Sequence, residues 1–161
     1  MKLTWMGEYR DLVEALIHYC NIYAEAYKIE KMEYRGIHYS YSQIQVLEYL
    51  LENEERQENM SAIAQRLGIS RSNFSKIVTR LAAKGLVRKT LRPGSQKELL
   101  VTVLPQGRKL YEDYSSSIQW HFSPLFDQLK DVPQEYRDKM RDALFAAMRN
   151  SPYVRTVLEK E

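Results

Sequence analysis

The 161-residue sequence predicts a mainly α-helical protein with one small β-hairpin, in which long N- and C-terminal helices flank a central segment. Three observations favour this class. Apolar side chains recur at three- and four-residue spacing near both ends of the chain. Short helical segments bounded by capping residues and glycines occupy the middle. Directly after them, the period changes to the two-residue alternation of strands.

The N-terminal region, residues 8–34, predicts one long helix. Its apolar residues form two adjacent stripes at helical spacing, namely Leu12, Leu16, Tyr19, Tyr23 and Ala26, and Val13, Ile17, Cys20, Ala24 and Tyr27. A helix this long and this apolar needs more partner surface than one small domain offers.

Three shorter helices follow. Residues 41–55 begin with a predicted capping box, Ser42 with Gln45. Residues 59–68 have Asn59 as the expected N-cap, and residues 70–85 have Ser70. Neither of the last two would be stable as an isolated helix, so we expect packing to stabilise both.

Residues 86–91 and 99–104 alternate with a period of two and predict the hairpin. Between them, Arg92-Pro93-Gly94-Ser95 fits a type II turn, since proline sets φ at its second position and glycine accepts positive φ at its third. The tip of this hairpin carries Arg92, Gln96 and Lys97.

A second long helical pattern starts at Pro105, with a kink or break expected at Ser123 because Pro124 disfavours helical geometry there. A last helix is predicted to open at Asp131.

Charge is distributed unevenly along the chain. Residues 61–97 contain nine Lys or Arg and no Asp or Glu. Since nine of the 24 basic residues lie there, the other 15 face 21 acids, and the rest of the chain has a net charge of −6. A surface of one sign suits a polyanion, which means a nucleic acid first and an anionic membrane second. The segment predicts several short elements and no single amphipathic helix, which weakens the membrane alternative.

The same segment has the spacing of a helix-turn-helix. Ala64 is a small residue for the helix contact, Gly68 suits the turn, and Phe74 and Ile77 are bulky residues for the inner face of the second helix. The outer face is then polar, and the hairpin that follows makes the motif winged. We expect the second helix and the wing to bind DNA through Ser70, Arg71, Ser72, Asn73, Ser75, Lys76, Arg80, Arg92, Gln96 and Lys97.

Ser70 is the expected cap, with backbone amides near phosphate. Base reading is expected from Ser72, Asn73, Ser75 and Lys76, base or backbone contacts from Arg71 and Arg80, and wing contacts from Arg92, Gln96 and Lys97.

Residues 59–110 resemble the core of the MarR family of bacterial transcription regulators. The resemblance rests on Leu81, Gly85, Leu86 and Val87, with which the helix-turn-helix ends, and on Val103–Gly107 at the start of the long helix that follows. It implies a homodimeric repressor with a pseudo-palindromic operator, released by a small effector. By this resemblance, residues 1–36 and 106–161 form the dimerisation helices, and residues 37–105 form the DNA-binding domain.

Two positions depart from the family pattern. Where members usually have Asp-x-Arg in the wing, this chain has Ser95, Gln96 and Lys97, and Arg92 is the candidate substitute for the arginine. Where the family usually has a capping Thr, this chain has Leu104.

The effector is less clearly encoded. We expect Cys20 to be a buried, inert residue among apolar neighbours, with an oxidant-sensing thiol as the alternative, since one branch of the family uses a cysteine in its first helix. Trp5, Trp120 and the tyrosines are expected in the core, with an aromatic effector pocket as the alternative.

The sequence does not favour a metalloprotein or an enzyme. His18, His38 and His121 lack ligand spacing, and one cysteine cannot form a multi-cysteine zinc site, so no metal or other cofactor is expected. No phosphate-binding loop or nucleophile elbow is present, so an enzyme is not expected. The remaining alternative is a winged-helix protein-interaction module. The N-terminus predicts neither a signal peptide nor a membrane span, so we expect a cytoplasmic protein.

Overall fold

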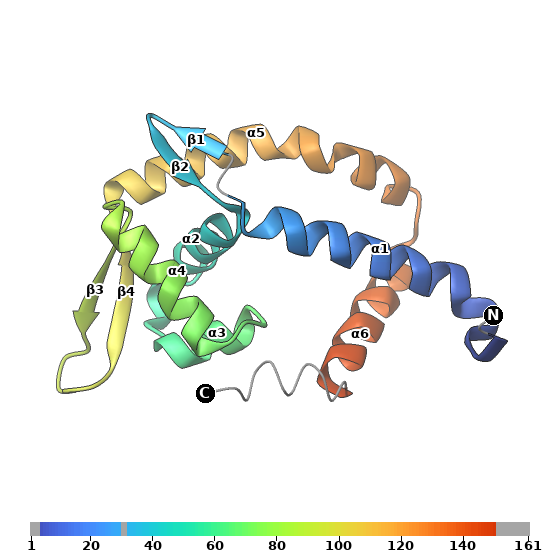
Figure 1. Cartoon of the computed structure of the whole chain (residues 1–161), viewed down its shortest axis with the longest axis horizontal. Coiled ribbons are helices and arrows are strands. Elements are labelled where there is room, and N and C mark those ends of the chain that lie inside the picture. The colour runs from blue at the N-terminus through green and yellow to red at the C-terminus, as the bar shows by residue number, and fades with distance from the viewer. Residues whose placement is uncertain (1–3, 30–31, 151–161) are drawn as a thin grey trace. The chain divides into compact units, whose positions relative to one another are not determined.

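The computed structural model describes residues 4–29 and 32–150, apart from the side chains of residues 4, 5, 117, 119–122 and 150 (Figure 1). In chain order the elements are η1 (Thr4–Tyr9), α1 (Arg10–Tyr27), β1 (Met32–Tyr34), β2 (Ile37–Tyr39), α2 (Tyr41–Glu52), η2 (Glu54–Arg56), α3 (Met60–Arg66), α4 (Arg71–Ala83), β3 (Val87–Leu91), β4 (Leu99–Val103), α5 (Pro105–Leu129) and α6 (Gln134–Asn150). The predicted class, mainly helical with a hairpin wing, is confirmed. The chain divides into two compact units, residues 1–45 and 46–161.

The first long helix is shorter than predicted. It ends at Tyr27, and residues 32–39 form an antiparallel hairpin, β1–β2, in which Tyr34 pairs with Ile37. Its two turn residues, Arg35 and Gly36, have φ values of 47° and 81°. Two consecutive positive φ angles are the geometry of a two-residue type I′ hairpin turn. The prediction of helix up to residue 34 is therefore wrong, because Gly36 and the alternating residues beside it favour a hairpin.

Helix α1 buries none of its residues within the chain. Tyr19 and Tyr23 stack with ring centroids 5.9 Å apart, and the Tyr27 hydroxyl donates a hydrogen bond to Gln45 Oε1 at 2.5 Å. Burial, and next the neighbouring Tyr23, raise the pKa of Tyr27 to about 12. The apolar stripes of α1 are thus correctly predicted as helical faces, and none of their residues is buried by the part of the chain that the structure describes.

Helix α2 begins one residue before its predicted cap, Ser42. Its first residue is Tyr41, and the Ser40 carbonyl accepts hydrogen bonds from the amides of Gln43 and Ile44. Ser42 therefore lies in the first turn, where its hydroxyl is 2.8 Å from the Ser40 hydroxyl. The predicted capping box of Ser42 with Gln45 is wrong, since the helical hydrogen bonding already starts from Ser40.

The two short helices are capped as predicted. The Asn59 side chain accepts from the Ala62 amide at 3.0 Å, and the Ser70 hydroxyl accepts from the Asn73 amide at 3.2 Å. Each such cap satisfies one amide that the helix leaves free, which stabilises a helix by ~1 kcal/mol. Helices α3 and α4 pack side by side, with α4 against β3 and α3 against β4 (Figure 1).

Besides the caps, an apolar core stabilises the short helices. The apolar core of the second unit is formed by Val46, Leu47, Leu50, Ile63, Ala64, Phe74, Ile77, Val78, Leu81, Leu86, Val87, Leu110 and Tyr114. These residues come from α2, α3, α4, β3 and the start of α5, so the winged segment is held together by long-range contacts. Burying one large aliphatic or aromatic side chain contributes about 1.5–3 kcal/mol.

The wing strands β3 and β4 pair antiparallel from Val87 opposite Val103 to Leu91 opposite Leu99. At the tip, Gly94 has a φ of 78° and the Ser95 amide donates to the Arg92 carbonyl at 3.0 Å. Both features agree with the predicted type II turn.

The start of α5 lies very close to the start of β3. A Cβ atom on Gly107 would lie 2.2 Å from the Leu86 carbonyl oxygen, so only glycine fits at this position. The same Leu86 oxygen accepts from the Leu104 amide at 2.9 Å. Leu104 itself provides no side-chain cap, but Pro105 at the first helical position has no N–H to satisfy. This proline partly explains why a leucine is tolerated at position 104.

Helix α5 continues through Pro124 to Leu129, so the alternative of a break at Ser123 is wrong. A proline removes one backbone hydrogen bond, and here the turns on either side remain helical. The last helix, α6, begins at Gln134, three residues after the predicted opening at Asp131. It exposes five large apolar residues, Tyr136, Met140, Leu144, Phe145 and Met148.

Candidate nucleic-acid interface

Helix α4 has one buried face and one exposed face. Phe74, Ile77, Val78 and Leu81 are buried, which fixes the rotation of the helix about its axis. Arg71, Ser72, Lys76, Thr79 and Arg80 are exposed, whereas Ser70, Asn73 and Ser75 are partly exposed. Every α4 residue predicted to bind DNA therefore lies on the outer side of the helix or at its N-terminal end.

Polar side chains at the N-terminal end of α4 are partly committed to local structure. The Ser70 hydroxyl lies 3.3 Å from the Ser72 hydroxyl, besides capping Asn73. The free amides of the first turn give this end a partial positive charge, which favours an anion such as phosphate. Ser70 is therefore better placed to present backbone amides to a phosphate than to read a base.

A contact that sequence reasoning missed joins the wing to α4. The Lys89 ammonium donates to Thr79 Oγ1 at 3.1 Å, and the Thr79 hydroxyl donates to the Ser75 carbonyl at 2.8 Å. Arg88, next to Lys89 on β3, is also exposed. In the sequence, the only indication of this contact is that Arg88 and Lys89 belong to the acid-free segment. The packing of β3 on α4 shows that they share a surface with α4.

Seven of the nine cations of residues 61–97 fall into two groups. Among the described residues, no ion pair or hydrogen bond engages the side chains of Arg71, Lys76, Arg80, Arg88 and Lys97. By contrast, Arg66 pairs with Glu58 at 2.9 Å and Arg92 pairs with Glu98 at 2.6 Å. The first group retains its full positive charge for a polyanion, whereas the second has that charge compensated.

The wing loop is ordered by its own side chains. The Ser95 hydroxyl accepts from the amides of Lys97 and Glu98 at 3.3 and 3.0 Å. A serine hydroxyl that binds backbone amides two and three residues on can order a turn much as an aspartate does. Ser95 thus fills structurally the place where the family pattern has Asp, and it leaves Gln96 and Lys97 exposed.

Arg92, the proposed substitute for the family's wing arginine, is engaged within the protein. Besides its ion pair with Glu98, its Nη2 donates to the Gln57 carbonyl at 2.6 Å. Its side chain is 35% exposed. Among the three predicted wing residues, Gln96 and Lys97 are thus the exposed ones, and Arg92 holds the base of the loop.

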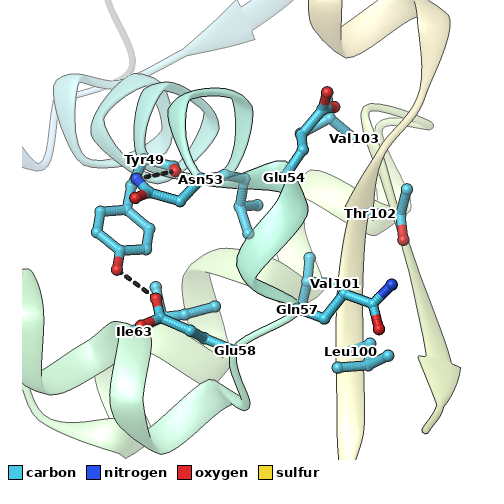
Figure 2. A pocket seen from close by; sticks show the side chains of 11 residues that line it. Tyr49, Asn53, Glu54, Gln57, Glu58, Ile63, Leu100, Val101, Thr102 and Val103 are labelled. Carbon is cyan, nitrogen blue, oxygen red and sulfur yellow. Dashed lines mark hydrogen bonds between the residues drawn. The ribbon is translucent and has the colours of Figure 1, made fainter.

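A cavity of about 150 Å³ lies between α2, η2, α3 and β4. Figure 2 shows Tyr49 of α2 pointing toward Glu58, with Leu100 to Val103 of β4 on another side. The Tyr49 hydroxyl donates to Glu58, which also accepts from Arg66 at 2.9 Å. Burial, and next this hydrogen bond, raise the pKa of Tyr49, while the same bond lowers the pKa of Glu58. These groups thus satisfy one another and connect α2 to α3.

The structure bears differently on the other candidate sites. Cys20 is exposed on α1, so the expectation that apolar neighbours of its own chain bury it is wrong. Among the described residues, His, Cys, Asp and Glu side chains do not form any group of three or more that could hold a metal ion. The side chains of Trp5, Trp120 and His121 lie outside the described residues. Every described helix is too short or too polar to cross a membrane.

Known proteins support the interpretation of the winged segment. Residues 36–98 match the profile of the MarR family. A 73-residue stretch is 33% identical to an uncharacterised HTH-type transcriptional regulator of Bacillus subtilis, YvnA, and covers 44% of this chain and 46% of that protein. The chain thus matches about half the length of this curated relative.

Solved structures are similar over most of the chain. The DNA complex of Staphylococcus aureus MepR has a TM-score of 0.65 at 20% identity, and the match covers 88% of this chain and 96% of that one. PcaV of Streptomyces coelicolor, in complex with its natural ligand, has a TM-score of 0.62 at 16% identity, with 89% and 94% covered. BldR of Sulfolobus solfataricus has a TM-score of 0.62 at 20% identity, with 88% and 99% covered.

At these identities the structural similarity establishes the fold and no more. Together with the profile match it confirms the resemblance found in the sequence. The chain therefore has the fold of MarR-family regulators, and its residues 36–98 match the model of that family.

Proposed function

We propose that the protein is a homodimeric, sequence-specific DNA-binding repressor of MarR type, located in the cytoplasm and released from its operator by a small effector. One observation carries the DNA-binding part: Arg71, Lys76, Arg80, Arg88 and Lys97 are unpaired among the described residues and lie on α4 and the wing. A set of uncompensated cations on one lobe suits the phosphates of a duplex. We propose no catalytic activity for the chain.

The proposed contacts follow from the exposure of each side chain. Ser72, Asn73, Ser75 and Lys76 would read base edges in the major groove, and Arg71 and Arg80 would bind bases or phosphates. Ser70 would act through the backbone amides that follow it. Gln96 and Lys97 would make the wing contacts, with Arg88 and Lys89 beside them.

Dimerisation is proposed through the terminal helices, residues 1–36 and 106–161, with residues 37–105 as the DNA-binding domain. The support is the exposed apolar surface of both regions. Its members are Tyr9, Leu12, Ile17, Tyr19, Ile22, Tyr23 and Ile29 near the N-terminus, and Leu125, Phe126, Tyr136, Met140, Leu144, Phe145 and Met148 near the C-terminus. Soluble monomers rarely expose this much clustered apolar surface. A dimer would place two recognition helices about 34 Å apart, which requires a pseudo-palindromic operator.

The test is a selection of DNA fragments by the full chain, followed by affinity measurements at several salt concentrations. Binding should enrich a pseudo-palindrome, and affinity should fall by about 10³-fold or more between 50 and 200 mM salt if six or more phosphates are neutralised. A protein that enriches no sequence and whose complexes do not depend on salt would instead be a winged-helix protein-interaction module.

A small-molecule effector is proposed because PcaV was crystallised with its natural ligand and CouR of Rhodococcus jostii with p-coumaroyl-CoA. In this chain Tyr19 and Tyr23 of α1 stack on each other, and such exposed rings suit an aromatic effector.

An oxidant-sensing repressor is a second candidate, favoured by the exposure of Cys20. An accessible thiol can be oxidised, whereas a thiol buried among apolar groups is inert. Peroxide treatment should then weaken operator binding by the wild-type protein and leave Cys20→Ser unaffected. Equal responses of the two proteins would eliminate this candidate.

A further inference from the structure

We propose that Arg92 is a positioning residue: it ties the wing to the turn before α3 and so determines where Gln96 and Lys97 meet DNA. This inference rests on the proposed DNA-binding function and deepens it. It changes the role that the sequence suggests for Arg92, which is a direct wing contact with DNA.

The side chain and the backbone amide of Arg92 make three contacts at the base of the wing loop. Its Nη2 donates to the Gln57 carbonyl at 2.6 Å, and its Nε lies 2.6 Å from Glu98 Oε2. Its backbone amide donates to the Glu98 carbonyl at 2.8 Å. One residue therefore closes the loop across the hairpin and also reaches a segment 35 positions away in sequence.

The Gln57 end of this contact is conformationally unusual. Gln57 has φ 45° and ψ 45°, a left-handed conformation that a residue with a side chain adopts at an energetic cost. Such a conformation persists when surrounding contacts hold it. The charged hydrogen bond from Arg92 to the carbonyl of this residue is one such contact. Since Gln57 lies in the connection between α2 and α3, the bond attaches the wing to the helix-turn-helix.

A role in positioning explains the geometry better than a direct DNA contact does. To enter a minor groove, the guanidinium would have to leave both Gln57 and Glu98, and the Glu98 carboxylate would remain unpaired beside phosphates. The loop beyond Arg92 is already ordered by Ser95, which binds the amides of Lys97 and Glu98. With its base held by Arg92 and its tip by Ser95, the loop presents Lys97 in one place.

The two roles predict different coupling between Arg92 and Lys97. If Arg92 positions the loop, removing it displaces Lys97, and the further loss of Lys97 has little effect. If Arg92 contacts DNA on its own, the two losses are independent and their effects multiply.

The experiment measures binding of the full chain to a selected operator fragment for wild type, Arg92→Ala, Lys97→Ala and the double variant. Each single change should weaken binding about tenfold, as expected for one charged hydrogen bond or phosphate contact. In the Arg92→Ala background, Lys97→Ala should cost less than about threefold. An equal loss in both backgrounds would overturn the proposal.

Arg92→Lys serves as the matched variant. A lysine keeps the positive charge near phosphate but lacks the planar fork that spans two partners. We expect Arg92→Lys to stay about as weak as Arg92→Ala, with thermal melting within a few degrees of wild type for both. Full recovery of binding by the lysine would identify a phosphate contact and overturn the proposal.

A readout without DNA separates this inference from the proposed function. The amide NMR signals of Gln57 and Glu58 should shift in Arg92→Ala and stay in place in Lys97→Ala. Unchanged signals in Arg92→Ala would overturn the contact even if the wild type binds operator normally. Shifted signals in a protein that binds no DNA fragment would overturn the proposed function and leave the contact in place.

Discussion

Helices α1 and α4 have comparable amphipathic patterns in the sequence but differ in how much of the apolar face the structure buries. Helix α4, 13 residues long, buries Phe74, Ile77, Val78 and Leu81 within the chain, whereas α1, with 18 residues, buries none. Periodicity therefore predicts an apolar face correctly in both cases. It does not say whether the surface that covers the face belongs to the same chain.

Two isoleucines make this difference measurable. Ile77 of α4 is 5% exposed and Ile17 of α1 is 53% exposed. Substituting each in turn tests whether α4 belongs to the core of the chain and α1 to an interface between chains.

The largest effect is expected for Ile77→Ala. Because its side chain is buried, the free energy of unfolding should fall by about 2–5 kcal/mol. Denaturant unfolding should give about the same loss at all protein concentrations, since the cavity lies within one chain. A loss below about 1 kcal/mol would contradict the packing described for α4.

Ile17→Glu should act on the dimer instead. A carboxylate placed in an apolar interface is costly to desolvate, so we expect the dimer dissociation constant to rise about 100-fold or more. Light scattering during size-exclusion chromatography should show monomer at concentrations where the wild type is dimeric.

The matched control for Ile17→Glu is Leu91→Glu, which changes an exposed apolar residue of the wing. It should leave the mass of the assembly unchanged. Equal masses for wild type and Ile17→Glu at every concentration would show that this face of α1 is not an interface.

A smaller loss is expected for Lys76→Ala, which keeps the buried face of α4 and changes its outer face. Operator binding should weaken by about 1–3 kcal/mol, with a shallower dependence on salt if the lysine binds phosphate. Lys130→Ala, at the end of α5 outside the proposed DNA-binding surface, is the control and should bind DNA as wild type does. Equal affinities for all three proteins would remove Lys76 from the interface.

The smallest effect concerns Tyr27 of α1 at alkaline pH. Because folding raises the pKa of Tyr27 from 10.0 to about 12, its stabilising contribution is complete below pH 10 and is lost as the pH rises through 12. After allowance for partial exposure to solvent, that contribution is about 1 kcal/mol. Wild-type stability should fall more steeply than that of Tyr27→Phe between pH 10 and 12, and parallel curves would contradict the shift.

Local signals in the sequence were sufficient for the winged segment. Asn59 and Ser70 cap their helices as predicted, and the predicted type II turn forms around Gly94. In each case the atoms involved lie within three residues of one another, so short-range geometry decides the outcome. The predicted end of the first helix and the predicted N-cap Ser42 were wrong. The first helix ends at Tyr27 because a hairpin pattern follows it, and the second helix starts at Tyr41, before Ser42.

By itself the sequence determined the helical class, the rotation of α4 about its axis and the concentration of cations on α4 and the wing. It could do so because the apolar period and the caps act between close neighbours. The tertiary structure decided which of those cations remain uncompensated. Glu98 and the Gln57 carbonyl engage Arg92 in the wing, as Glu58 neutralises Arg66 of α3, whereas Lys89 keeps its charge and donates a hydrogen bond to Thr79. Arg92 and Lys89 have partners on other elements, and the acids that pair with Arg66 and Arg92 lie just outside the basic segment. Whether each of these cations finds its partner therefore depends on how the elements pack.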